Sequence, residues 1–228
     1  MVLGKNNISK NKNHQHEKGN VLFLALMAFV LFVALAYAVM HSFRTRDDSN
    51  REVDFRSAAS MTQYSSAIRT GVTRMLLRDI PLQNLDFTIP DAQQNLSAEQ
   101  AANMVFNTAG GGVTYRAIPD GIVNVLQQQA SDFTARRNGN WYFTMIGINR
   151  VGTHQKELVA VLYDVKQQLC EDINYQITGN STLPKLDVSS DAVLQGRINL
   201  GGPTIDGQPF LCISTRDAFL YYHVLAEQ

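Results

Sequence analysis

The stretch HEKGNVLFLALMAFVLFVALAYAVMHS, residues 16–42, decides the fold. Its centre, residues 21–40, contains twenty consecutive residues without a charge. A helix of that length measures about 30 Å, which matches a bilayer core, whereas the apolar part of a cleaved secretory signal has about 7–15 residues. The length therefore predicts a membrane-spanning helix over residues 20–41. Cleavage by signal peptidase stays open as an alternative, because AYA at residues 36–38 fits its small-x-small pattern.

The charge of the chain is zero overall but unevenly distributed. Residues 1–19 hold four lysines against one glutamate, and residues 44–79 hold seven arginines against five acidic residues. Residues 80–228 hold nine basic and fourteen acidic side chains, a net charge of −5. This last region would repel a polyanion, so nucleic acid is not expected as a partner. Beyond the apolar stretch, the 228-residue chain has room for one ordinary domain.

Basic residues do not fix the orientation of the predicted span, because four lysines precede it and four arginines follow within about fifteen residues. The two cysteines, Cys170 and Cys212, both follow the span. An even pair is typical of a disulfide in an oxidising compartment, and a metal site would need more ligands. We therefore expect a cytoplasmic N-terminus, an exported remainder and a Cys170–Cys212 bridge. Two separate buried thiols are the alternative.

Residues 44–79 contain no proline and one glycine, which allows the helix to continue past the membrane. Pro81 marks its expected end. Apolar residues at intervals of three and four predict one buried stripe. This stripe consists of Met61, Tyr64, Ile68, Val72, Met75 and Leu76. In the polar segment RTRDDSNR, residues 44–51, Asp48, Ser49 or Asn50 could cap a new helix, so a kink or a second helix start there stays open.

The remaining residues predict an α+β head. Alternation and β-branched or aromatic content predict strands over residues 113–118, 141–148, the start of 158–177, 209–214 and 219–226. The last two strands form a terminal hairpin. Helical spacing predicts helices over residues 98–106, 119–130 and the later part of 158–177. The three glycines at 110–112 predict a turn, because a phosphate loop would also need Lys and Ser or Thr.

The sequence offers no combination of nucleophile, base and orienting acid, so we expect neither an enzyme nor a cofactor. Asp187 and Asp191, in the segment DVSSD, are weak candidates for calcium ligands. Calcium takes six to eight oxygen ligands, so two carboxylates favour a solvated loop instead.

A basic leader ends in glycine directly before a bilayer-length helix, at the segment Glu17-Lys18-Gly19-Asn20. This arrangement resembles the N-terminus of type IV pilins and pseudopilins. The resemblance implies that a prepilin-type peptidase cleaves between Gly19 and Asn20 and that the new amino group of Asn20 is methylated. It implies a single-pass protein of the bacterial inner membrane that assembles with other pilin or pseudopilin subunits of a pilus or secretion filament. The assembly helix would include Leu22, Leu24, Leu26, Phe29 and Leu31.

One position departs from the family pattern. Most pilins carry a glutamate five residues into the mature chain, where this sequence has Leu24. A buried ammonium without a carboxylate partner is costly, so Leu24 favours a minor, tip-like pseudopilin over a bulk pilin.

The resemblance implies four parts: a leader (1–19), a transmembrane or filament-core helix (20–41), an amphipathic stalk (42–80) and a head (81–228). In the head, an antiparallel sheet would lie against the stalk. The alternative function is a single-pass anchored domain that senses or binds a ligand outside the cytoplasm.

Overall fold

The computed structural model describes residues 18–42, 48–89, 95–119, 121–124, 136–138, 140–153 and 155–228. The chain forms two compact units, residues 1–49 and 50–228. Five α-helices and one short 3-10 helix lie in the described residues: α1 (Lys18–Ser42), α2 (Asp48–Leu76), η1 (Leu82–Asn84), α3 (Ala98–Asn103), α4 (Gln167–Thr178) and α5 (Ser190–Leu194). The described strands are β1 (Arg136–Asn138), β2 (Trp141–Ile148), β3 (Glu157–Tyr163), β4 (Asn199–Leu200), β5 (Phe210–Ser214) and β6 (Phe219–Ala226).

The sheet of the second unit is mixed. Its main path runs in the order β1-β2-β3-β6-β5, and every pair along it is antiparallel. The two-residue strand β4 adds a parallel pair at the end of β2, where Gly147 faces Asn199 and Ile148 faces Leu200. The fold class α+β is therefore confirmed, with a mixed rather than purely antiparallel sheet.

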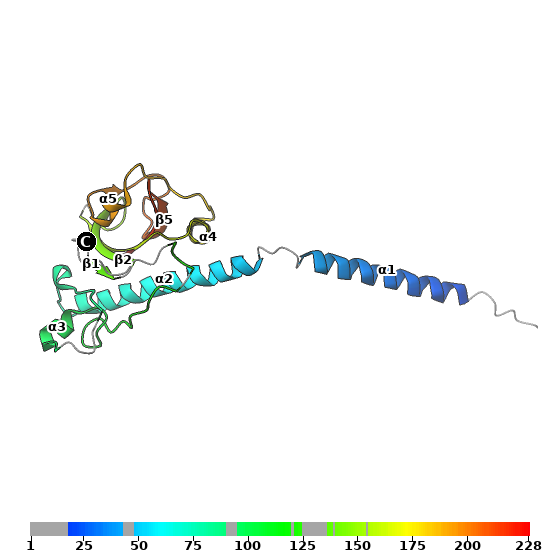
Figure 1. Ribbon diagram of the computed structural model, residues 1–228, viewed down its shortest axis with the longest axis horizontal. Coiled ribbons are helices and arrows are strands. Elements are labelled where there is room, and N and C mark those ends of the chain that lie inside the picture. Colours follow the sequence, from blue (N-terminus) through cyan, green and yellow to red (C-terminus); the bar gives the residue numbers. More distant parts are fainter. Residues whose placement is uncertain are drawn as a thin grey trace, which may run out of the picture. The chain divides into compact units, whose positions relative to one another are not determined.

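Both faces of this sheet are buried. On one face, Trp141, Phe143, Leu162 and Tyr221 share a core cluster with the buried residues of α2 and α4. On the other face, Tyr142, Val161 and Tyr222 share a second cluster with Val193 and Leu194 of α5. Figure 1 shows α2, in cyan, on one side of the sheet and α5, in orange, on the other. The second unit is thus built in three layers.

Most of the predicted elements are confirmed. The strand over 141–148, the strand-to-helix change within 158–177, the hairpin of β5 and β6 and the helical turns after residue 98 all lie where the patterns predict them. For the predicted kink or second helix start within residues 44–51, the structure has the helix α2 beginning at Asp48. Residues 43–47, which precede α2, lie outside the described residues.

Two predicted elements are wrong. Residues 113–118 form no strand, because the segment crosses α2 instead of joining the sheet: the backbone N–H of Arg116 donates to the hydroxyl of Tyr64. The predicted helix over 119–130 is absent from its described part, residues 119 and 121–124, where Val123 forms an isolated bridge with Val165. Residues 120 and 125–130 lie outside the described residues.

The turn predicted for the three glycines is confirmed, and close packing explains the first two of them. A side chain at Gly110 would clash with the carbonyl oxygen of Met104. A side chain at Gly111 would lie 2.5 Å from the carbonyl oxygen of Val105 and 3.0 Å from its Cα. Gly112 has φ +67°, a left-handed backbone conformation that residues with a Cβ atom rarely adopt. The glycines therefore allow two backbone segments to lie against each other.

Candidate assembly surface

Helix α1 carries a continuous apolar surface. Twelve large hydrophobic side chains between residues 22 and 37 are 48–71% exposed within the single chain. They include all five residues predicted for the assembly helix, namely Leu22, Leu24, Leu26, Phe29 and Leu31. Burying one such side chain is worth about 1.5–3 kcal/mol, so covering twelve of them is worth on the order of 20 kcal/mol. In general, apolar surfaces of this size are typical of sites that interact with a protein or a membrane.

In the part of the chain that the structure describes, no helix is long and apolar enough to cross a membrane. The side chains described in α1 cover residues 22–37, whereas the predicted span covers residues 20–41. Both ends of that span therefore lie outside the described side chains, and the span stays a prediction. The predicted processing residues, Gly19 and Asn20, lie in the first turn of α1, which begins at Lys18.

Helix α2 packs its predicted stripe against the sheet. Met61, Tyr64, Ile68, Val72 and Met75 are buried, and Leu76 is partly buried against the same cluster. The ring of Tyr64 lies 6.1 Å from that of Trp141 in an edge-on arrangement. This packing explains why the apolar residues of α2 recur every three or four positions.

A buried chain of hydrogen bonds connects α2 to β6. The hydroxyls of Ser65 and Tyr221 lie 3.1 Å apart, and the Tyr221 hydroxyl lies 3.0 Å from Nδ1 of His223. Burial lowers the pKa of His223 to about 4, and the positive charge of Arg69 contributes. Arg69 in turn forms a salt bridge with Glu227, with an N–O distance of 3.1 Å. Burial also raises the pKa of Tyr221. The side chains of Ser65, Tyr221 and His223 are therefore all uncharged at physiological pH.

Two arginines, one at the end of α2 and one in the turn that follows it, hydrogen-bond to the glycine turn. The guanidinium of Arg74 donates to the carbonyl of Gly111, and that of Arg78 donates to the carbonyls of Ala109 and Gly110. At Gly71, an added Cβ would clash with Val113 and lie 3.2 Å from the carbonyl oxygen of Gly111. The one glycine of α2 is therefore where residues 111–113 pass closest to the helix.

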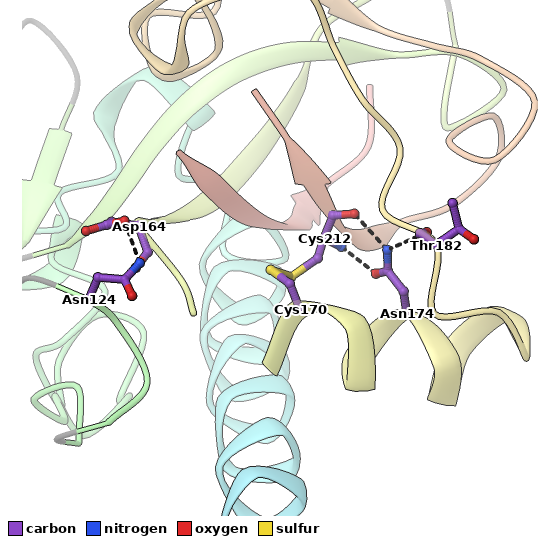
Figure 2. The surroundings of a disulfide bond; sticks show 6 residues. All are labelled: Asn124, Asp164, Cys170, Asn174, Thr182 and Cys212. Carbon is purple, nitrogen blue, oxygen red and sulfur yellow. Dashed lines mark hydrogen bonds between the residues drawn. A yellow bond between two sulfur atoms is a disulfide. The ribbon is translucent and has the colours of Figure 1, made fainter. Parts of the chain in front are cut away.

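The predicted disulfide between Cys170 and Cys212 is confirmed. It joins α4 to β5, the last strand along one edge of the sheet, and both cysteines are buried. Figure 2 shows the carboxamide of Asn174 beside the bridge. It donates to the carbonyl of Cys212 at 2.9 Å and accepts from the same residue's N–H at 2.8 Å. Asn174 thus supplies the pairing that a neighbouring strand would give.

The predicted calcium candidates are not brought together with further ligands in the described structure. Asp187 forms a salt bridge with Arg216 at 2.7 Å, and this hydrogen bond lowers the pKa of the carboxyl group. Asp191 lies in the first turn of α5. Among the described residues, no group of three or more His, Cys, Asp or Glu side chains is placed to hold a metal ion.

Sequence patterns missed several residues of these contacts. Ser65, Asn174 and Glu157 are polar but fully buried. Glu157 Oε2 accepts from the N–H of Ile148, two residues past the end of the β2–β3 pairing. Asn174 follows Cys170 by one helical turn, which was the one available signal that it lies beside the bridge. Ser65 and Glu157 carry no such signal, because each depends on a partner that is distant in the sequence or at a strand end.

Comparisons with protein-family models, with characterised proteins and with solved structures found no match.

Proposed function

We propose that the chain is a pilin-like or pseudopilin-like structural subunit. In this proposal, a prepilin-type peptidase removes residues 1–19, α1 is stored in the bacterial inner membrane, and α1 then packs among the equivalent helices of other subunits in a filament or its tip. The head projects outside the cytoplasm and performs no catalysis.

The apolar surface of α1 is the observation that carries this proposal. Its twelve exposed hydrophobic side chains lie all around the helix rather than on one stripe. A helix that is apolar on every side needs apolar surroundings on every side, which a bilayer or a bundle of similar helices provides. One flat partner surface would leave half of the helix in water.

Two features of the second unit and one of α1 support the same proposal. Helix α2 gives its apolar stripe to the sheet, so α2 is fixed to the head through its own core. The disulfide fits an oxidising compartment outside the cytoplasm. The leucine at position 24 leaves no carboxylate on this part of α1, which suits a subunit at the tip.

Photo-cross-linking in native membranes tests the assembly step. A photoreactive residue is placed at Phe29 or Leu31 in the full chain, and the matched control carries it at Thr204, an exposed head residue. The proposal expects cross-linked species to pilin-like subunits from both α1 positions and none from Thr204. Cross-links from α1 to lipid alone, at every expression level, would indicate a plain anchored domain and refute assembly.

A further inference from the structure

We infer that Ser65 of α2 determines which ring nitrogen of His223 carries the proton, acting through Tyr221. The chain of hydrogen bonds between these three side chains then has one direction. It begins at Nδ1–H of His223 on β6, passes through the hydroxyl of Tyr221 and ends at the hydroxyl of Ser65. Ser65 is thus a positioning residue for a buried histidine. The inference concerns the second unit alone and does not depend on the proposed function.

The hydroxyl of Ser65 has one proton, and the backbone of α2 already accepts it. Ser65 is fully buried, and its Oγ donates to the carbonyl of Met61 at 3.0 Å and to that of Thr62 at 3.2 Å. A serine within a helix can donate in this way to the carbonyl one turn before it. The oxygen of Ser65 therefore faces the Tyr221 hydroxyl, 3.1 Å away, as an acceptor.

The same direction continues from Tyr221 to His223. Tyr221 also has one hydroxyl proton, and donating it to Ser65 leaves the phenol oxygen as an acceptor towards Nδ1, 3.0 Å away. His223 is neutral at physiological pH, so its ring carries one N–H. That proton then lies on Nδ1. In the described structure Nε2 has no hydrogen-bond partner, so no contact there favours the other tautomer.

The opposite direction would make one hydrogen bond fewer. In it, Ser65 would donate to Tyr221 and Tyr221 to a bare Nδ1, so the bond from Ser65 to the carbonyl of Met61 would be lost. Water cannot compensate for this loss, because Ser65 and Tyr221 are both 0% exposed. One neutral hydrogen bond is worth a factor of about five in an equilibrium. The Nδ1–H tautomer should therefore exceed the Nε2–H tautomer by about five to one.

These hydrogen bonds also tie the position of α2 to the sheet. Tyr221 belongs to the core cluster that contains Ile68 and Trp141, and a polar group in such surroundings needs its partner in place. If α2 moved by four residues, Met61 or Arg69 would replace Ser65 opposite Tyr221. A methionine is a weak acceptor, and an arginine cannot accept at all. The observed register of α2 is therefore the favoured one.

Nitrogen NMR of the full chain tests the inference, in detergent at pH 7.5 and with ¹⁵N in the histidine rings. Spectra that correlate ring nitrogens with ring protons distinguish the protonated nitrogen from the bare one. The signal of His223 is identified among those of the five histidines by its loss in His223→Gln. We expect Nδ1 to carry the proton in the natural chain. In Ser65→Ala we expect Nε2 to carry it, because Tyr221 can then donate only to the ring.

The matched control is Ser66→Ala. Ser66 also donates to a helix carbonyl, that of Thr62, but it is exposed, so its loss should leave the proton of His223 on Nδ1. A natural chain with the proton on Nε2, or with the two tautomers in equal amounts, would refute the direction of the hydrogen bonds. A folded Ser65→Ala protein that keeps Nδ1–H would refute the role of Ser65. Thermal unfolding checks the fold of each variant, and the natural chain alone decides the direction if Ser65→Ala does not fold.

Discussion

The buried histidine His223 predicts how the stability of the head depends on pH. His223 is 3% exposed, and its ring stacks on that of Phe210. Its Nδ1 forms a hydrogen bond with the hydroxyl of Tyr221. The charged groups closest to this site in the described contacts are Arg69, which disfavours a second positive charge, and Glu227, which pairs with Arg69. Protonation of His223 is therefore unfavourable in the folded state.

The magnitude follows from the pKa. The pKa of His223 is about 4 in the folded protein, compared with 6.5 ordinarily. At about 1.36 kcal/mol per pH unit, this difference corresponds to about 3 kcal/mol. Because the folded pKa is the lower one, the unfolded chain takes up the proton first as the pH falls. Above pH 6.5 the histidine is neutral in both states and costs no stability. Between about pH 6.5 and 4 the free energy of unfolding falls by this amount, because only the unfolded chain gains the proton.

The assay uses the fluorescence of Trp141, the one tryptophan, which lies in the core beside Tyr64 and Tyr221. The full chain in detergent is unfolded with urea at pH 7.5 and at pH 4, with the disulfide intact. The variant His223→Gln keeps a hydrogen-bonding side chain but does not titrate. The loss of unfolding free energy on acidification should be about 3 kcal/mol larger for the natural chain than for the variant.

Acidic residues titrate in the same range, but they do so in both proteins, so their effect cancels in the difference. Equal losses in the two proteins would show that His223 is protonated as easily in the fold as in water. A larger loss in His223→Gln would reverse the sign and refute the argument from burial.

Three further predictions concern the same unit, each measured as the free energy of urea unfolding. Gly71→Ala should destabilise by about 1–2 kcal/mol, because the clash with Val113 exceeds the gain in helix propensity of about 1 kcal/mol; a stabilised variant would contradict the close crossing. Replacing both Cys170 and Cys212 by Ala should cost about 4 kcal/mol, since the bridge spans 42 residues, and a loss under 1 kcal/mol would contradict its role. Asn174→Ala should cost about 2–4 kcal/mol by leaving the buried N–H and carbonyl of Cys212 unpaired, whereas Gln176→Ala on the exposed face should change little.

The elements that could be predicted are those with a strong local pattern. Six of the eight residues of β2 are aromatic or β-branched, and α4 places Leu169 and Ile173 one turn apart on one buried face. The stripe of α2 was visible for the same reason, because its residues share one core cluster with residues of the sheet. Such periodicity is imposed by the partner surface and is therefore recorded in the sequence.

The elements that could not be predicted depend on distant partners. Residues 113–118 have strand-like composition, yet their neighbour is α2, and the backbone of Arg116 bonds to Tyr64. The glycines at 110 and 111 indicate a turn, but only the fold places them against the backbone of Met104 and Val105. Asp187 carries no mark in the sequence that its partner is Arg216. The pairing of the two cysteines was predictable because there are only two.

The central claim is that residues 1–19 are removed while α1 stays joined to the head. The intact mass of the native protein, isolated from membranes, measures this directly. We expect a chain that begins at Asn20 with a methylated amino group, and a variant with Leu in place of Gly19 should keep the leader, whereas His16→Ala should be processed normally. A native chain that begins at Met1, or at Val39 after loss of the apolar helix, would contradict the claim.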